Sequence, residues 1–333
     1  MQLTNENNHS LSIAVWLATD DYDHNPCPGE KYISATGLLN PTRMIVLADR
    51  VSKDMRADTE LDITDLLASR LGTAIHDGIE KAWNTNAHNA LKILGYPEKM
   101  INRVLINPTS EELEATKNPI PVYMEQRAFK RINGHIIGGK YDFVGDGHLE
   151  DFKSTGVYSY IKGSSDEKHR IQGSIYRWLN PEIVTSDIML VQYLFTDWSK
   201  LHAKIRKDSG YPQSRAVTKK LQLLSLEETE QFIFNKLSEI ETFRNKDEND
   251  LPGCTSEDLW QSDPVYKYFG KVGAKRSSGN FDNYAEAHAK MTKAGKGFIE
   301  EVPGSVRRCG YCKAYDLCTQ KDIYLTNGTL VLP

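Results

Sequence analysis

The 333-residue chain has no apolar run long enough to cross a bilayer. The longest early apolar run, residues 13–18, is also too short for a secretory signal, and polar rather than basic residues precede it. With 39% hydrophobic and 26% charged residues, the composition is ordinary for a globular protein and argues against fibrous and membrane classes. We therefore expect a cytoplasmic protein with no membrane partner.

Cysteine is also scarce, and its count of five is odd. In a chain with no export signal, an odd count argues against a disulfide framework. The chain has no Gly-x-x-x-x-Gly-Lys-Ser/Thr run either, so it carries no sign of a nucleotide-driven motor. The five cysteines must therefore be explained in another way.

The chain has no strong excess of charge of one sign, since its net charge is −4. A mild acidic balance excludes no polyanionic partner, because local clustering decides where an anion binds. Residues 199–220 hold seven Lys or Arg against one Asp. Such a run is commonly a solvated surface, and the alternative is a surface that follows nucleic-acid phosphates.

Hydrophobic spacing predicts helices and strands in mixed order. Apolar residues four positions apart predict a helix from an Asp65 cap to about Trp83 and another over residues 166–179. The pattern also predicts an irregular segment at 95–120, a strand at 188–195, a helix at 224–244 capped by Ser225, a linker at 251–253, a hairpin at 265–276 and a helix at 283–293.

The clearest β signal is a pair of hairpins. Strands are predicted at 121–130, 135–145 and 148–153, joined by Asn133-Gly134 and Asp146-Gly147, which favour two-residue type I′ turns. With such turns, Asp142 falls opposite both Glu125 and Asp151. Lys153, two residues beyond Asp151, shares its face because side chains alternate along a strand.

Three carboxylates on neighbouring strands lie roughly 5 Å apart and repel one another. A bound Mg²⁺ or Mn²⁺ would account for the row, and the alternative is a solvated acidic face whose turns have a different register. Carboxylates that hold a metal, with a lysine beside them, suit phosphodiester hydrolysis. The metal activates water, and the lysine offsets the developing negative charge.

Four motifs carry a resemblance to a known family. Gly139-Lys140-Tyr141-Asp142 followed by Asp151-Phe152-Lys153 resembles the PD-(D/E)XK nuclease signature. The Gly-x-x-x-His run ending at His76 and the Gln-x-x-x-Tyr run from Gln172 to Tyr176 resemble the RecB-type exonuclease branch. All four occur in the expected order over residues 70–180.

The resemblance implies an α/β, restriction-endonuclease-like core in which helices flank a mixed β-sheet. It places a nuclease domain with an N-terminal helical segment at 1–250, and a cysteine-cluster region packing on it at 251–333. It implies that His76, Asp142 and Asp151 bind the metal, that Lys153 is the catalytic lysine, and that Glu125 is an auxiliary ligand or base. Gln172, Tyr176 and His169 would support the site and contact the DNA backbone. The plainer alternative is an ordinary His76 and a helix whose outer face carries Gln172 and Tyr176.

Three cysteines crowd the C-terminus as Cys309-x2-Cys312-x5-Cys318. Zinc and iron–sulfur clusters usually take four ligands, so Cys254 or Cys27 must complete the set. The spacing is similar to that of RecB-type nucleases with an iron–sulfur cluster, such as AddB and the CRISPR-associated exonucleases, whose fourth cysteine lies upstream as Cys27 does. The Pro-Gly-Cys-Thr segment around Cys254 resembles phage-encoded relatives, so Cys254 is favoured. The resemblance implies a [4Fe–4S] cluster first and structural zinc second, either acting as a staple.

Two functions follow as hypotheses. The first is a divalent-metal-dependent DNA nuclease, preferably an exonuclease, acting in recombination, repair or degradation on duplex ends or single strands. The second is a DNA-binding partner of a recombinase or helicase that does not cleave. The intact set of Glu125, Asp142, Asp151 and Lys153 favours the enzyme. Expected partners are a recombinase, a helicase or a single-strand-binding protein, in the host cytoplasm if the chain is phage-encoded.

Overall fold

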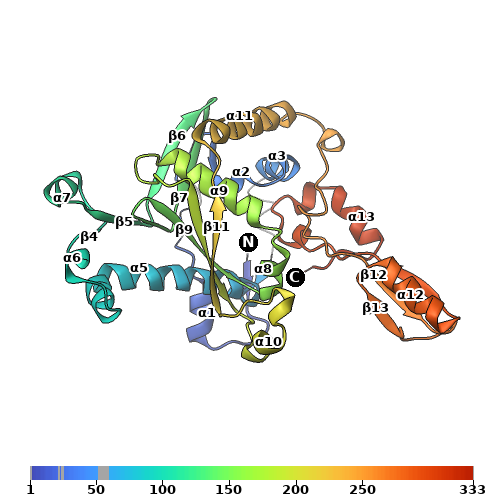
Figure 1. Ribbon diagram of the computed structural model, residues 1–333. Helices are drawn as coiled ribbons and strands as arrows, with labels where there is room; N and C mark the ends of the chain where they lie inside the picture. Colours follow the sequence, from blue (N-terminus) through green and yellow to red (C-terminus); the bar gives the residue numbers. More distant parts are fainter. Residues whose placement is uncertain (1, 22, 24–25, 52–59, 333) are drawn as a thin grey trace. The chain divides into compact units, whose positions relative to one another are not determined.

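The computed structural model describes residues 2–21, 23, 26–51 and 60–332 (Figure 1). Internal contacts divide the chain into two compact units. The first unit comprises Met1–Leu39 and Ala57–Glu239, and the second comprises Asn40–Arg56 and Ile240–Pro333. None of the helices that the structure describes combines the length and apolar character of a membrane span.

The first unit is built on a six-stranded mixed sheet in the order β11-β10-β9-β8-β5-β4. Strands β9 and β10 pair in parallel, as do β4 and β5, and the other pairs are antiparallel. This confirms the predicted α/β class with a mixed sheet. The strands are β4 (Val104–Ile106), β5 (Ile120–Met124), β8 (Phe143–Gly145), β9 (His148–Thr155), β10 (Ile188–Phe195) and β11 (Ala216–Gln222).

A second sheet of the same unit has the order β2-β7-β6, and a parallel pair joins β1 to β3. These strands are β1 (Gln2–Thr4), β2 (Tyr32–Ser34), β3 (Glu60–Asp62), β6 (Arg127–Ile132) and β7 (His135–Lys140). The prediction of unbroken strands at 121–130 and 135–145 was wrong, because each is split between the two sheets. The predicted register was right, since Ile132 pairs with His135 and Phe143 with Glu150.

The splits occur where the backbone leaves the extended conformation. Glu125 has φ 52°, in the left-handed region, so β5 cannot continue directly into β6. Opposite it, the fully buried Tyr141 donates its hydroxyl to Gln126 Oε1 at 2.9 Å. Both turns keep the predicted chemistry, because each residue of Asn133-Gly134 and Asp146-Gly147 has positive φ.

Helix α5 (Leu67–Ile93) is the longest helix of the first unit and ends ten residues beyond the prediction. A 3₁₀ turn, η1 (Ile63–Leu66), precedes it, and the capping carboxylate is that of Asp62 rather than Asp65. The additional turns bring Leu91 against the apolar cluster that contains Val122 and Phe143. Tertiary packing thus extends the helix through a stretch rich in asparagine, a weak helix former.

The other helices of the first unit are mostly short, apart from α9, which matches its predicted bounds. They are α1 (Leu11–Ala18), α2 (Ala35–Leu38), α6 (Glu98–Ile101), α7 (Ser110–Ala115), α8 (Val157–Lys162), α9 (Asp166–Leu179), α10 (Lys200–Ile205) and the turn η2 (Lys207–Ser209). Residues 95–120 were predicted to be irregular, yet they form α6, β4 and α7. Helix α11 (Leu226–Phe243) begins in the first unit, and the predicted cap Ser225 accepts the N–H of Glu228.

Helices α5 and α9 lie on opposite faces of β9 in the main sheet (Figure 1). On the α5 side, the Phe152 ring lies 5.7 Å from the His76 ring. On the α9 side, the His169 ring lies 6.3 Å from that of Tyr193, the register partner of Lys153. The sheet is therefore flanked by helices, as predicted.

The second unit combines an N-terminal helix with the C-terminal tail. Its elements are α3 (Thr42–Arg50), η3 (Glu248–Asp250), β12 (Val265–Phe269), β13 (Gly279–Phe281), α12 (Tyr284–Ala294), β14 (Phe298–Val302), η4 (Arg308–Tyr311), η5 (Tyr315–Leu317) and α13 (Gln320–Thr326). The hairpin expected at 265–276 has a longer loop, because its second strand starts only at Gly279.

Gly139 of β7 offers a test of the packing between this strand and α9. A Cβ at Gly139 would lie 2.7 Å from a carbon of the Tyr176 ring, whereas a Cβ at the exposed Gly78 of α5 would meet nothing within 4 Å. We expect Gly139→Ala to lower the free energy of unfolding by about 1–3 kcal/mol. Gly78→Ala, the matched control, is expected to raise it by up to about 1 kcal/mol. Urea unfolding measures both, and equal effects would contradict the packing.

Candidate metal centre and cysteine pocket

The two strand breaks bring Glu125 and Asp142 together. Glu125 donates its backbone N–H to the Asp142 carbonyl at 3.1 Å. Its left-handed conformation costs about 1–2 kcal/mol for a residue with a Cβ. Such backbone strain persists where the surroundings impose it, and it gathers at functional sites.

His76 reaches the same place from α5. Its Nδ1 lies 3.4 Å from Asp142 Oδ1 and 3.9 Å from Glu125 Oε1. Its Nε2 lies 3.1 Å from the Phe152 carbonyl oxygen, a contact that fixes the ring when Nε2 carries the proton. Among the described His, Cys, Asp and Glu residues, these three are the one group whose ligand atoms lie within 4.8 Å of one another.

The charges around His76 favour binding of a cation. Burial by itself lowers the pKa of His76, but the carboxylates of Asp142 and Glu125 outweigh burial and raise it to about 10. The group therefore has an excess of negative charge that draws a cation. One imidazole and two carboxylates form a donor set that suits a divalent metal ion.

The buried Asp151 and the half-buried Lys153 form an ion pair beside this group. Lys153 Nζ lies 2.9 Å from Asp151 Oδ1 and 2.7 Å from Oδ2. Burial lowers the pKa of Lys153, but the carboxylates of Asp151 and Asp142 raise it further, so the ammonium is retained. Both carboxylate oxygens of the buried Asp151 therefore lie against the Lys153 ammonium, which compensates the charge of Asp151.

Of the predicted carboxylate row, Asp142 and Glu125 lie together with His76 in the compact group, and the ion pair of Asp151 lies beside it. Asp142 is held by the Phe152 N–H, which donates to its Oδ2 at 3.0 Å. The charges of Asp142 and His76 both act on the pKa of Asp151, so Asp151 belongs to the same electrostatic environment.

Lys140 is a residue of the site that the sequence analysis did not single out. Its ammonium pairs with Glu125 Oε2. The available signal was its position in the signature, two residues before Asp142 and, by hairpin register, opposite Arg127. The pair compensates part of the negative charge of Glu125.

Of the residues predicted on α9, His169 lies within the electrostatic environment of Lys153, and Gln172 and Tyr176 contact each other. Gln172 donates from Nε2 to the Tyr176 hydroxyl at 2.8 Å, and Tyr176 is buried. Burial, and then the charge of Lys153, lower the pKa of His169 to about 4, so this imidazole is neutral. These placements suit a supporting role, while contact of these residues with the DNA backbone stays a prediction.

The basic stretch 199–220 forms α10, η2 and β11. Lys219 pairs with Asp166 and lies 5.7 Å above the Tyr160 ring, so it has a partner within the unit. Lys200, Lys204 and Arg206 are exposed. The stretch thus divides into a structural lysine and a solvated part.

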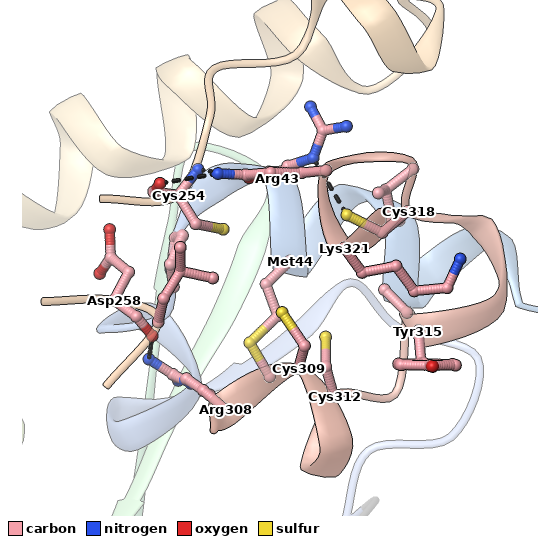
Figure 2. Close-up of a pocket in the computed structure, with 15 residues that line it drawn as sticks. Arg43, Met44, Cys254, Asp258, Arg308, Cys309, Cys312, Tyr315, Cys318 and Lys321 are labelled. Carbon is pink, nitrogen blue, oxygen red and sulfur yellow. Dashed lines mark hydrogen bonds between the residues drawn. The ribbon is translucent and has the colours of Figure 1, made fainter. Parts of the chain in front are cut away.

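In the second unit, Cys254, Cys309, Cys312 and Cys318 line one pocket (Figure 2). Burial raises the pKa of Cys254 to about 12 and that of Cys309 to about 11, and neighbouring cysteines add to both shifts. Arg43, itself buried, donates from Nε to Cys318 Sγ at 3.3 Å. Cys27, the alternative fourth ligand, belongs to the first unit.

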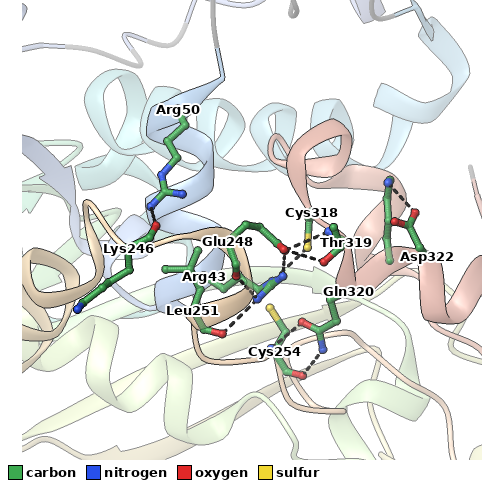
Figure 3. A network of polar contacts seen from close by, with 11 residues as sticks. Arg43, Arg50, Lys246, Glu248, Leu251, Cys254, Cys318, Thr319, Gln320 and Asp322 are labelled. Carbon is green, nitrogen blue, oxygen red and sulfur yellow. Dashed lines mark hydrogen bonds and ion pairs between the residues drawn. The ribbon is translucent and has the colours of Figure 1, made fainter.

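Cys254 is positioned by the side-chain amide of Gln320. Its N–H donates to Gln320 Oε1 at 2.8 Å, and its carbonyl accepts from Gln320 Nε2 at 2.9 Å (Figure 3). This pair of hydrogen bonds joins the segment of Cys254 to α13, directly after the cysteine triplet. The geometry therefore groups the favoured fourth cysteine with the other three.

Comparisons with known proteins identify no family. No family description matches the sequence, and no curated protein matches it. The fold is similar to the crystal structure of SSO0001, at 15% identity and a TM-score of 0.37, over 71% of this chain and 83% of that one. It is also similar to a phage-related exonuclease from Haemophilus somnus 129PT, at 13% identity and a TM-score of 0.26, over 63% and 92%. At these values, function must be argued from the site itself.

Proposed function

We propose that this protein is a divalent-metal-dependent deoxyribonuclease of the RecB-type PD-(D/E)XK branch, acting as an exonuclease. One observation carries the proposal: the ligand atoms of His76, Glu125 and Asp142 converge within 4.8 Å beside the Asp151–Lys153 ion pair. The convergence occurs at two strand breaks, one of which keeps a strained glutamate. A solvated acidic face would not account for the buried Asp151 carboxylate and the lysine paired with it.

Each residue has a role that its position supports. His76, Asp142 and Asp151 would hold Mg²⁺ or Mn²⁺, and Glu125 would act as an auxiliary ligand or accept a proton from water. When bound, the metal supplies an activated water and neutralises charge on the phosphate. Lys153 holds its ammonium beside these carboxylates, where it offsets the negative charge that grows on the phosphate oxygens.

Asp142→Asn tests the proposal, with Asp146→Asn as the matched control. Both remove one carboxylate charge, but Asp146 is exposed at a turn, where asparagine tolerates its φ of 49°. With Mn²⁺ and end-labelled linear DNA, duplex and single-stranded, we expect Asp142→Asn to lower the cleavage rate at least about 100-fold. Asp146→Asn is expected to stay within about twofold. An inactive wild type, or equal rates for both variants, would reject the enzyme in favour of a non-cleaving DNA-binding protein.

We also propose that the cysteine pocket holds a [4Fe–4S] cluster bound by Cys254, Cys309, Cys312 and Cys318. All four line the pocket, yet no three of these described cysteines have sulfur atoms within 4.8 Å of one another. A single tetrahedral zinc ion would need sulfurs about 3.8 Å apart. The wider spacing therefore supports a cluster over zinc, and its contribution would be a crosslink within the second unit.

A further inference from the structure

The segment between Cys254 and the cysteine triplet folds into a small module of its own. Strands β13, β12 and β14 form an antiparallel sheet in that order, and α12 packs on its strands (Figure 1). The Tyr266 and Tyr284 rings lie 5.8 Å apart, and Asn283 caps the helix by accepting the N–H of Glu286. The proposed metal centre and the proposed cluster use no residue of this module.

The topology brings two loops to one end of this sheet. Phe269 ends β12 and stacks on Phe298, which begins β14, with ring centroids 5.1 Å apart. The β12–β13 loop, residues 270–278, and the loop from α12 to β14, residues 295–297, both start or finish there. The two loops lie close together, because a Cβ at Gly297 would lie 3.1 Å from Gly270 Cα. Tyr268 of β12 also donates its hydroxyl to the Lys296 carbonyl at 2.9 Å.

Positive charge gathers at this end. The module, residues 265–302, holds seven Lys or Arg and four Asp or Glu, a net charge of +3 in a chain whose total is −4. We call the cations carried by the two loops and by the last turn of α12 the basic end. They are Lys271, Lys275, Arg276, Lys293 and Lys296. The acidic residues lie away from this end: Asp282 and Glu286 where β13 leads into α12, and Glu300 and Glu301 along β14.

The cations of the basic end are exposed, and none forms an ion pair within the described residues. Lys293 has a local role, because a cation near a helix C-terminus offsets the helix dipole. Lys271, Lys275 and Arg276 lie in a loop and have no such role. Val272, between them, is 90% exposed, so the loop packs on little of its own unit.

We infer that the basic end binds the phosphate backbone of DNA, as a second contact surface of the same protein. The inference relies on the proposed function for its choice of polyanion. Several unpaired cations on adjacent loops match a row of phosphates better than one small anion, and no base-reading geometry is required. Binding is expected to be independent of sequence and to weaken steeply with salt.

The test uses the full chain in EDTA, so that no cleavage occurs, and measures binding of fluorescently labelled single-stranded and duplex DNA over a salt series. The variant replaces Lys271, Lys275 and Arg276 with alanine. The control replaces three exposed lysines of the first unit, Lys92, Lys99 and Lys117, with alanine, which gives the same change in net charge. We expect the loop variant to bind at least about tenfold more weakly, with a salt slope smaller by about 2–3. The control is expected to stay within about twofold.

A second variant, Val272→Arg, adds a cation to the exposed loop and is expected to bind a few-fold more tightly. Both loop variants should keep the wild-type melting temperature. The inference is overturned if wild type binds no DNA at low salt, or if the loop and control variants bind alike. Because EDTA prevents cleavage in this test, equal binding by the loop and control variants would contradict the inference without bearing on the proposed nuclease activity. A loop that binds DNA in an inactive protein would contradict the proposed function alone.

Discussion

Replacing Lys153 with alanine is expected to lower the rate of DNA cleavage about 100- to 1,000-fold, with little change in the concentration of DNA that half-saturates the protein. The half-buried ammonium lies beside Asp151, within the electrostatic environment of Asp142. It is therefore placed to act on charge that develops during the reaction rather than on DNA at the surface. Steady-state kinetics with Mn²⁺ separate the two effects.

A second variant distinguishes a catalytic effect from unfolding. Lys153→Ala leaves Asp151 buried without its cation, so part of its effect will be a loss of stability, on the order of 3 kcal/mol. Lys153→Arg keeps the charge and the pair, and should unfold at nearly the wild-type temperature. Its planar guanidinium places the charge differently, so it should still cleave more slowly than wild type. A Lys153→Ala variant that cleaves within tenfold of wild type would refute the role.

The second large effect is expected at the cysteine pocket. Cys254→Ser should lose most of the bound iron and the broad visible absorbance of a cluster, and should unfold at a lower temperature. Cys27→Ser is the matched control, because it makes the same substitution at the other candidate ligand, and it should keep both properties. The small apolar core of the second unit, centred on Leu259 and Val306, explains why a metal crosslink matters to its stability.

Iron content, zinc content and visible absorbance of anaerobically purified protein measure this prediction. Cys312→Ser should behave as Cys254→Ser does, because both would be ligands of the same cluster. A colourless wild type with stoichiometric zinc would contradict the cluster. Loss of iron in Cys27→Ser rather than in Cys254→Ser would identify Cys27 as the fourth ligand.

The hairpin register could be predicted because Asn133-Gly134 and Asp146-Gly147 leave few choices of loop length. The break between β5 and β6, which shapes the metal centre, could not be predicted from the sequence. It depends on Glu125 adopting a left-handed conformation and on the Tyr141 hydroxyl reaching Gln126, and both are tertiary effects. The position of His76 beside Asp142 came from a motif rather than from periodicity, since an isolated histidine on a helix has no preferred partner.

The sequence also could not predict that residues 40–56 belong to the second unit. Helix α3 joins the cysteine region through the buried Arg43, which donates to the carbonyls of Glu248 and Leu251 and to Cys318 Sγ (Figure 3). Arg43 also pairs with the Glu248 carboxylate. These contacts join residues more than 200 positions apart, and nothing local marks an arginine that will be buried. Internal contacts thus assign α3 to the second unit, whereas the predicted division at residue 250 grouped it with the nuclease domain.

Anomalous diffraction from crystals of the full chain soaked in Mn²⁺ tests the metal centre most directly. We expect a peak within coordination distance of His76 and Asp142, with Glu125 or Asp151 as a further ligand. The peak should disappear in Asp142→Asn crystals and remain in Asp146→Asn crystals. A wild-type crystal with no peak among these side chains, or with Mn²⁺ bound only elsewhere, would contradict the account.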